Sequence, residues 1–216
     1  MTNVGDMVGI RRGLSRTAQK NLRVRRDVLD RSRPVVMLSG MAADYLTRIH
    51  SIHHALGIPA GYPARRHLPI QREARRLVVA ARAADDGQPV RLSPRAAAAW
   101  KKMQAAAARE GVNLLPLSGF RSVARQTAII RQKLADGQTL PAILRLVAAP
   151  GCSEHHTGRA LDLGDSNHIA LDVDFAKTSA FRWLMKRAGE FGFRLSYPLK
   201  NRHGIDYEPW HWFCHW

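Results

Sequence analysis

Two short polar blocks, far apart in the sequence, place the strongest constraint on how this chain can fold. The first runs from Ser153 to Asp162 and holds two adjacent histidines and a final aspartate, and the second is Glu208-Pro209-Trp210-His211. Two imidazoles and one carboxylate can bind one metal ion and leave a coordination position open, as catalytic zinc sites do. Water at such a position has a pKa of roughly 7, and a nearby carboxylate can accept its proton. A fold that unites these blocks would support metal-assisted hydrolysis.

Spacing within each block suggests how its side chains meet. His155 and Asp162 are seven positions apart with a glycine between them, so a loop that turns into a strand suits a shared metal better than one continuous element. Asp162 is a polar residue in an otherwise apolar strand, and a buried carboxylate without a partner costs on the order of several kcal/mol, so it needs a partner such as a cation. Glu208 and His211 would point to opposite faces of a flat strand, and a bend at Pro209 would direct both into one cleft.

The order and spacing of these residues resemble a known family. Ser-x-His-x-x-Gly-x-Ala-x-Asp from Ser153 to Asp162, followed by Glu-x-x-His, is similar to the zinc D-Ala-D-Ala carboxypeptidases of the VanY type, within the M15 family of cell-wall peptidases. Upstream, Ser118-Gly119-Phe120-Arg121-Ser122 with Gln126 resembles the arginine motif that this family places before its first ligand. The resemblance covers roughly residues 70 to 216, with the three blocks in the expected order.

The resemblance implies a role for each matching residue. His155, Asp162 and His211 would bind zinc. Glu208 would accept the proton of the zinc-bound water and pass it to the leaving amine. Arg121 would stabilise the developing oxyanion or hold the substrate, because a guanidinium offers planar, charged donors.

Neighbouring residues receive lesser roles. Ser153 would hydrogen-bond the substrate or order the first ligand, with a local turn cap as the alternative. His156 stands where the family pattern varies, so we interpret it as a neighbour and not a ligand, and Gln126 as a supporting or packing residue. Trp210 and Trp212 would form a wall of the cleft or join the core, and Trp210 is also a candidate for substrate binding.

Two further groups have a simpler interpretation. His50, His53 and His54 share a predicted helix face without a carboxylate motif, so we expect a surface cluster. Cys152 and Cys214 each lie three residues from a predicted ligand. Two small buried residues are the favoured interpretation, and a disulfide or competition for zinc are the alternatives.

Periodicity and turn signals predict an α+β fold, with a small, mainly antiparallel sheet, flanking helices and the zinc site in the cleft. We expect a basic N-terminal extension over residues 1–40, with Met41 as a hypothetical start of the folded protein. A helix and linker over 41–69 would pack on a VanY-like domain over 70–216. Helices are predicted over residues 43–54, 71–84, 94–110, 123–134, 140–147 and 179–190, and strands over 114–117, 159–163, 193–197 and 207–213.

The charge of the chain is extreme. It is +17, from 34 Lys and Arg against 17 Asp and Glu, and residues 34–216 alone carry +11. Such a field attracts polyanions, among them nucleic acid, anionic lipid and acidic wall polymers, and does not choose among them. No apolar run approaches the ~20 residues of a membrane-spanning helix. Because no convincing export signal precedes the domain, we expect a cytoplasmic location, with a periplasmic or cell-wall location as the alternative. We also expect a monomer.

Several functions compete. The leading prediction is a zinc D,D-carboxypeptidase that acts on peptidoglycan stem peptides or muropeptides, with Zn2+ as its cofactor and no nucleic acid as a partner. A D,D-dipeptidase, or an L,D or L-Ala-D-Glu endopeptidase, would share the zinc ligands and differ in the loops around the cleft. A basic nucleic-acid-binding protein is favoured by charge alone and lacks a recognisable motif. The intact Glu208 argues against a wall-binding module with a dead site.

Overall fold

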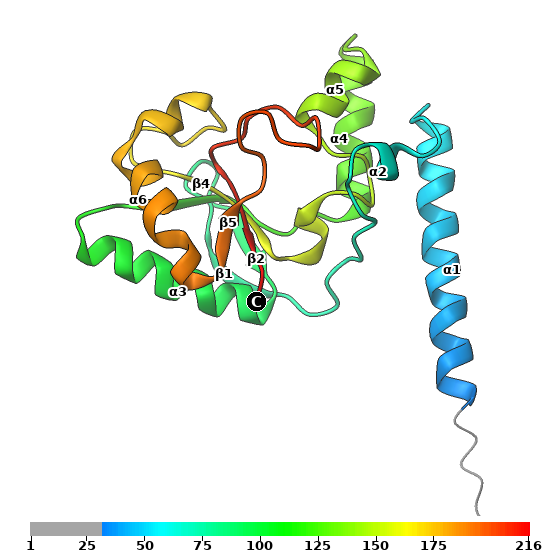
Figure 1. Cartoon of the computed structure of the whole chain (residues 1–216), viewed down its shortest axis with the longest axis horizontal. Helices are drawn as coiled ribbons and strands as arrows, with labels where there is room; N and C mark the ends of the chain where they lie inside the picture. The colour runs from blue at the N-terminus through cyan, green and yellow to red at the C-terminus, as the bar shows by residue number, and fades with distance from the viewer. Residues whose placement is uncertain (1–31) are drawn as a thin grey trace, which may run out of the picture. The chain divides into compact units, whose positions relative to one another are not determined.

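The structure is a computed structural model that describes residues 32–216, with side chains described from residue 43 onward (Figure 1). Most of the predicted basic extension, residues 1–31, therefore lies outside the described residues. The chain divides into a unit Met1–Ser39 and a unit Gly40–Trp216. In the first unit the structure describes the beginning of helix α1 (Ser32–Ala55), which starts earlier than the predicted residue 43. Among the described helices, none combines the length and the apolar character needed to span a bilayer.

A four-stranded antiparallel sheet is the frame of the second unit. Its strands follow the order β3 (Leu115–Ser118), β4 (Ala160–Gly164), β6 (His211–Cys214) and β5 (Phe193–Leu195). This arrangement confirms the predicted α+β class with a small antiparallel sheet. In the register, Asp162 of β4 lies opposite Ser118 of β3 on one side and His211 of β6 on the other. Residues from all three motif blocks are therefore brought to one region of the sheet.

The helix predicted over residues 71–84 is wrong. This segment leads into strand β1 (Val78–Arg82), which forms an antiparallel hairpin with β2 (Pro89–Leu92). The β-branched pair Val78-Val79 favours a strand, and Gly87 adopts φ 71° in the connection, which suits a tight turn. Asp86-Gly87 can end a helix or join two strands, and here it joins β1 to β2.

The remaining predicted helices are confirmed within a few residues. They are α3 (Pro94–Arg109), α4 (Val123–Ala135), α5 (Leu140–Leu146) and α6 (Ser179–Arg187), to which the structure adds the short α2 (Tyr62–Arg65) and the 3-10 turns η1 (Glu154–Thr157), η2 (Val173–Lys177) and η3 (Ala188–Phe191). Ser122 caps α4 as expected, since its hydroxyl accepts a hydrogen bond from the Arg125 amide at 3.1 Å. Figure 1 shows α3 and α6 together in one part of the unit, and α4 and α5 together in another.

Two clusters of buried hydrophobic residues form the core. One contains Trp100 of α3 together with Leu161 and Leu163, which share one face of β4 as strand alternation predicts. The other contains residues of α2, α4 and α5 and of connecting segments, among them Tyr197 and Ile205 between β5 and β6. Cys152 belongs to the second cluster and Cys214 to the first, and both are buried free thiols. This agrees with the interpretation of two small buried residues and not with a disulfide.

The predicted surface cluster of histidines is only partly correct. His50 and His54 are exposed. His53 is buried, and its Nε2 lies 2.7 Å from the carbonyl oxygen of Pro150. The ring also packs edge-on against Tyr62 of α2. His53 therefore connects the second half of α1 to the body of the unit, a contact that no local sequence pattern reveals.

Candidate metal centre

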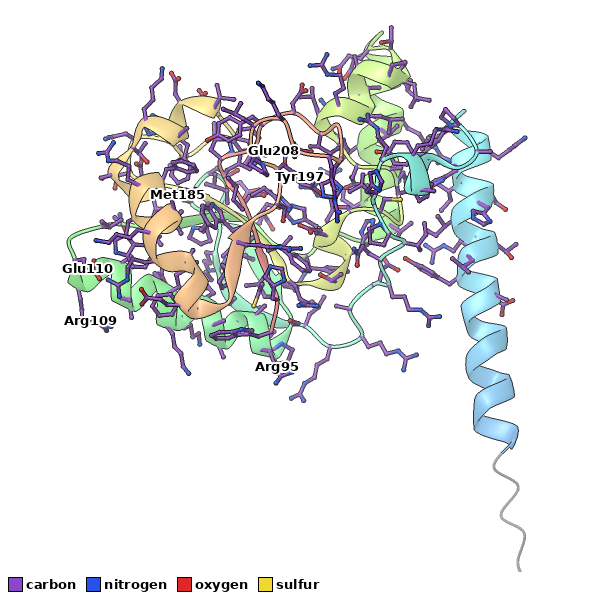
Figure 2. The ribbon with its side chains drawn as sticks, viewed as in Figure 1. Arg95, Arg109, Glu110, Met185, Tyr197 and Glu208 are labelled. Atoms are coloured by element: carbon purple, nitrogen blue, oxygen red, sulfur yellow. The ribbon has the colours of Figure 1, made fainter. Side chains whose placement is uncertain are left out.

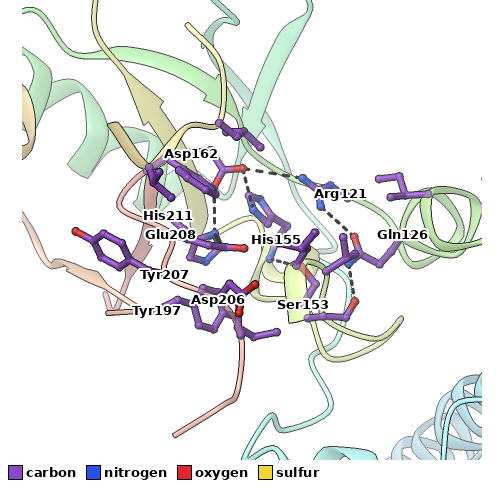
Figure 3. A pocket seen from close by; sticks show the side chains of 18 of the residues that line it. Arg121, Gln126, Ser153, His155, Asp162, Tyr197, Asp206, Tyr207, Glu208 and His211 are labelled. Carbon is purple, nitrogen blue, oxygen red and sulfur yellow. Dashed lines mark hydrogen bonds and ion pairs between the residues drawn. The ribbon is translucent and has the colours of Figure 1, made fainter. Parts of the chain in front are cut away.

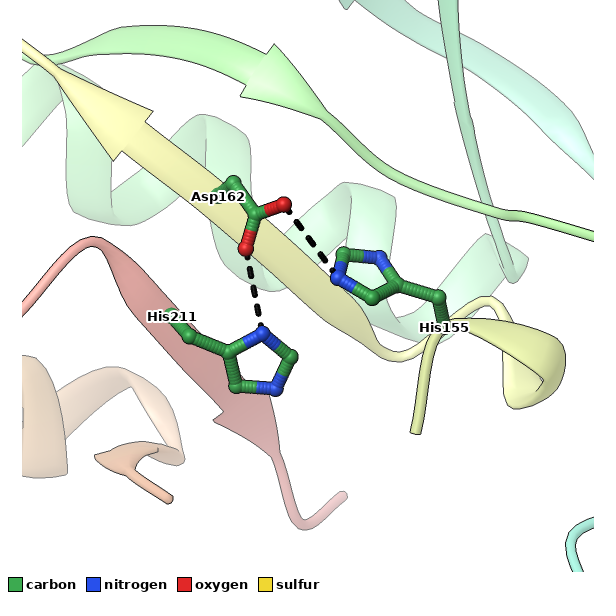
Figure 4. A group of neighbouring side chains, drawn as sticks. All are labelled: His155, Asp162 and His211. Carbon is green, nitrogen blue, oxygen red and sulfur yellow. Dashed lines mark hydrogen bonds and ion pairs between the residues drawn. The ribbon is translucent and has the colours of Figure 1, made fainter. Parts of the chain in front are cut away.

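Three candidate ligands meet at the paired strands β4 and β6 (Figure 4). Asp162 lies between two imidazoles: its Oδ2 is 3.2 Å from Nε2 of His155, and its Oδ1 is 3.1 Å from Nδ1 of His211. One ligand atom from each residue lies within 4.8 Å of the others, and all three residues are buried. His155 arrives from η1, the turn that precedes β4, so the predicted loop-to-strand geometry is what the structure shows.

The donor set fits a tetrahedral metal ion. Zinc takes nitrogen and oxygen ligands at about 2.0–2.2 Å, which separates donors in a tetrahedron by about 3.4 Å. Each histidine nitrogen lies near this distance from one oxygen of Asp162, 3.2 Å to Oδ2 and 3.1 Å to Oδ1, and one donor atom from each of the three residues lies within 4.8 Å of the others. Two nitrogens and one carboxylate oxygen leave a fourth position open, as catalytic zinc sites do.

The unused nitrogen of each histidine is held by a hydrogen bond, which sets the orientation of the ring. His155 Nδ1 lies 2.5 Å from the carbonyl oxygen of Gly119, so this nitrogen donates and Nε2 keeps its lone pair for the centre. His211 Nε2 lies 3.0 Å from Oε2 of Glu154, so its Nδ1 faces Asp162. Such partners are typical of metal-binding histidines. Gly119 must be a glycine, because a Cβ there would lie 2.6 Å from the Arg91 carbonyl oxygen.

The charges at the centre are strongly coupled. Burial by itself lowers the pKa of His211, but hydrogen bonds to Asp162 and Glu154 outweigh it and raise that pKa to about 10. Burial would raise the pKa of the Asp162 carboxyl, and the His155 and His211 imidazoles hold it well below its usual range instead. Burial lowers the pKa of His155. A metal that binds Nδ1 of His211 must therefore displace a proton, as metal binding to histidine generally does.

Glu208 reaches the same cavity from the loop that precedes β6. The segment bends at Pro209, where the His211 amide donates to the Glu208 carbonyl oxygen at 3.1 Å, and Glu208 Oε2 lies 3.8 Å from His211 Nδ1. The predicted bend therefore places both side chains together. Burial raises the pKa of Glu208 to about 7, although the nearby His211 charge lowers it. This value suits a general base near neutral pH, and a cation bound by the three ligands would lower it.

Arg121 forms the opposite wall of the centre (Figure 3). Its guanidinium lies 4.0 Å from Oδ2 of Asp162 and donates to Oε1 of Gln126 at 3.1 Å. Gln126 is buried and in turn donates from Nε2 to the Ala148 carbonyl oxygen at 2.7 Å. Gln126 therefore fixes the guanidinium beside the carboxylate, which gives physical content to the supporting role expected for it.

The cavity around these groups has a volume of about 540 Å³. Ser153 lines it, and its hydroxyl also accepts a hydrogen bond from the His155 amide at 3.3 Å. The N-cap of η1 and the ordering of His155 are thus the same hydrogen bond. Substrate binding by Ser153 stays a prediction.

Trp210 is a half-buried residue of the cavity wall that also packs against the core. Three aliphatic side chains that line the cavity are about half exposed: Leu146, Leu171 and Val173. In Figure 2, Glu208 and Tyr197 lie near the middle of the view, and Arg95 and Arg109 of α3 lie along its lower edge.

Comparison with known proteins decides the family. Residues 89–215 match the family model described as VanY, D-alanyl-D-alanine carboxypeptidase. The chain belongs to the VanY family. Among curated relatives, it is 40% identical over 120 residues to the putative carboxypeptidase YodJ of Bacillus subtilis (strain 168), across 54% of this chain and 43% of that protein. It is 32% identical over 127 residues to the bifunctional D-Ala-D-Ala dipeptidase and carboxypeptidase VanXYC of Enterococcus gallinarum, across 56% of this chain and 66% of that protein. The match thus covers less than two thirds of either relative.

Solved structures of the same family share the fold. The LdcB LD-carboxypeptidase aligns with a TM-score of 0.61 at 32% identity, over 68% of this chain and 71% of that one. A variant of the D,D-pentapeptidase VanY in complex with Zn(II) aligns with a TM-score of 0.53 at 27% identity, over 68% and 82%. In this VanY-family chain the three candidate ligands, Arg121 and Glu208 all lie inside residues 89–215, whereas α1, α2 and β1 precede that range.

Glu154, the acceptor of the His211 hydrogen bond, is a site residue that was not predicted from the sequence. Glu154 belongs to the same 3-10 turn as His155, so one short segment supplies a candidate ligand and also orients the other histidine. Its Oε2 also accepts a hydrogen bond from the Ser196 hydroxyl at 2.6 Å. The sequence does show an acidic residue directly before His155. Its partner, His211, could not be identified without knowing how β6 pairs with β4.

We expect Glu154→Ala to lower the affinity for zinc about 10-fold to 100-fold, because His211 would lose the acceptor that fixes its ring. Competition with a fluorescent chelator measures this affinity without any substrate. Glu154→Gln keeps an oxygen acceptor and should lose less. An alanine variant that binds zinc as tightly as the original protein would contradict the assigned role.

Proposed function

We propose that this VanY-family protein is a zinc-dependent D,D-carboxypeptidase that hydrolyses D-Ala-D-Ala-type bonds of peptidoglycan stem peptides. The observation that carries the proposal is the combination of three buried candidate ligands with Glu208. Glu208 lines the same cavity, and its carboxylate is not one of the candidate ligands. Two relatives support the metal and the substrate: one VanY structure is a complex with Zn(II), and another is VanYB in complex with D-alanine-D-alanine.

The side chains that would hold zinc are His155 through Nε2, His211 through Nδ1 and Asp162 through a carboxylate oxygen. Bound zinc would act as a Lewis acid on the scissile carbonyl and make water a stronger nucleophile at neutral pH. The chain presents these donors in a buried site that needs little rearrangement, since the free nitrogens of both rings are already hydrogen-bonded.

The other residues of the cavity would move a proton and bind charge. Glu208, with a pKa raised by burial, would take a proton from the attacking water at its carboxylate and return it to the nitrogen of the leaving D-alanine. Arg121, fixed by Gln126, would offer N–H donors to the oxyanion that forms at the carbonyl or to the carboxylate of the substrate. The burial of Asp162 and His211 keeps bulk water away from these groups and strengthens their electrostatic interactions.

A second candidate activity is L,D-carboxypeptidase, in which the residue before the scissile bond has L configuration. The observation that favours it is the alignment with LdcB, which has a higher TM-score, 0.61, than the VanY complex with Zn(II), 0.53. The proposed ligands, base and arginine serve both reactions equally well. The two candidates differ only in the side of the cavity that contacts this preceding residue.

Product analysis tests the proposal. We expect zinc-loaded protein to convert a pentapeptide muropeptide into a tetrapeptide, with loss of a single alanine detected by mass spectrometry. Conversion of a tetrapeptide into a tripeptide would identify the L,D activity, release of a dipeptide from the pentapeptide would identify an endopeptidase, and hydrolysis of free D-Ala-D-Ala to two alanines would identify a dipeptidase. A protein that contains zinc and leaves all of these substrates intact would refute the proposed function.

A further inference from the structure

The proposed base lies in an irregular loop. Residues 196–210, which connect β5 to β6 and are called the base loop below, contain no helix or strand and carry Glu208 near their end. Connecting loops are usually the mobile parts of a fold. A general base displaced by about 1 Å can lose about 100-fold in rate, so the base loop must be held in place for the proposed chemistry.

One arginine outside the family match is bonded directly to the base loop. Arg66 follows α2, and its NH1 group donates to the carbonyl oxygens of His203 at 3.2 Å and of Gly204 at 2.6 Å. Its NH2 group donates to the carbonyl oxygen of Leu144 in α5 at 3.0 Å. A single guanidinium therefore joins the base loop to a helix of the second core cluster. The planar guanidinium donates to the base loop from NH1 and to α5 from NH2, a fixed two-nitrogen geometry that the single ammonium nitrogen of lysine does not reproduce.

The contact is reciprocal and close. The ring Nδ1 of His203 lies 3.1 Å from the backbone carbonyl oxygen of Arg66, so each residue bonds to the main chain of the other. Gly204 adopts φ 61°, and a Cβ at this position would collide with NH1 of Arg66. The base loop thus has a glycine where the guanidinium lies against its backbone. The fit indicates a built contact and not a chance approach of a surface side chain.

Between the Arg66 contact and Glu208, the base loop is also held by buried Ile205 and by further hydrogen bonds. Beyond Gly204, the Asp206 amide donates to the carbonyl oxygen of Arg145 at 2.7 Å, and the Asp206 carboxylate accepts from the Arg145 guanidinium at 2.9 Å. The Glu208 amide then donates to the carbonyl oxygen of Tyr197 at 3.1 Å. Tyr197 in turn packs against the ring of His211, with centroids 4.8 Å apart.

We propose that Arg66 is a positioning residue that holds the base loop and thereby places the Glu208 carboxylate beside the metal ligands. The segment around α2, which precedes the range shared with the VanY family, would then be part of the working enzyme and not a spacer. The effect of Arg66 on catalysis rests on the proposed function, because it depends on Glu208 being the base. The restraint of the base loop by Arg66 does not depend on the proposed function.

Arg66→Ala tests the proposal, with Arg65→Ala as the matched control. Arg65 is the adjacent, exposed arginine of α2 and makes no side-chain hydrogen bond or ion pair among the described residues. We expect Arg66→Ala to lower kcat about 10-fold to 100-fold, because the base loses its position. The zinc affinity should stay within about twofold, because the candidate metal ligands lie outside the contact with Arg66. Equal kcat values for the two alanine variants would overturn the proposal.

Hydrogen exchange of the full chain gives a second readout that needs no substrate. We expect the amides of Asp206 and Glu208 to exchange faster in Arg66→Ala than in Arg65→Ala, while amides of the four-stranded sheet keep their rates. Faster exchange in a protein that cleaves no muropeptide would uphold the restraint and refute the proposed function instead. Unchanged exchange would refute the restraint, whatever the activity.

Arg66→Lys covers the case in which the alanine variant does not fold. Lysine keeps the charge and the apolar stem, but its single ammonium nitrogen does not reproduce the two-nitrogen geometry of the guanidinium. We expect this variant to retain the melting temperature within a few degrees and to lose several-fold in kcat. A lysine variant with the original kcat and the original exchange of the base loop would overturn the proposal.

Discussion

We expect Glu208→Gln to lower kcat by about 100-fold to 10,000-fold while zinc remains bound. The range is that of a positioned group that transfers a proton in the transition state. Glutamine has the same shape but cannot accept the proton, and the three candidate ligands are on other residues. The substitution also removes a carboxyl group whose charged form is disfavoured by burial, so the melting temperature should not fall.

Two measurements on the same preparation check this expectation. The turnover of a pentapeptide muropeptide gives kcat, and the metal content of the dialysed protein shows that zinc is retained. Glu190→Gln is a suitable control, since Glu190 is an exposed carboxylate on η3 that pairs with Arg187. A Glu208→Gln protein that retains more than about a tenth of the original kcat would contradict the role of general base.

Local patterns were sufficient to predict which side chains come together at the candidate metal centre. Alternation along β4 separated Asp162 from Leu161 and Leu163, and the structure places the two leucines in the core and the aspartate in the cavity. The bend at Pro209 explained how Glu208 and His211 can share one cavity, although they lie three positions apart. These predictions depend on a few neighbouring residues and on the geometry of one strand or one turn.

The supporting contacts could not be predicted, because they join segments whose pairing is set only by the folded chain. Arg66 and His203 are 137 positions apart, and Glu154 and His211 are 57 apart. No periodicity connects such residues. The mistaken helix over residues 71–84 has a different cause. There the local signal was ambiguous, and pairing of Val78 with Leu92 in the β1–β2 hairpin decided for the strand.

Asp162→Asn should remove the metal and weaken the fold at the same time. Loss of a ligand is a larger change than loss of a ligand's partner, so we expect the zinc affinity to fall by more than about 100-fold. The variant also leaves His211 without one of the two carboxylates that raise its pKa to about 10. Because that pKa is raised, the stabilising pair is fully present below the pKa of the unfolded imidazole, persists in part at pH 7, and is lost as the pH passes about 10.

The loss of stability should therefore be measured at pH 7. Removing one partner of a buried ion pair costs about 3–5 kcal/mol, which corresponds to a decrease of about 10 °C in melting temperature for a unit of this size. A structural ion pair and a metal centre make different predictions for added zinc. If the centre binds zinc, saturating zinc should raise the melting temperature of the original protein and leave that of Asp162→Asn unchanged, because only a state that binds the ion is stabilised by it. An equal increase in both proteins would show that zinc binds elsewhere, and Asp162 would then be a structural residue that pairs His155 with His211.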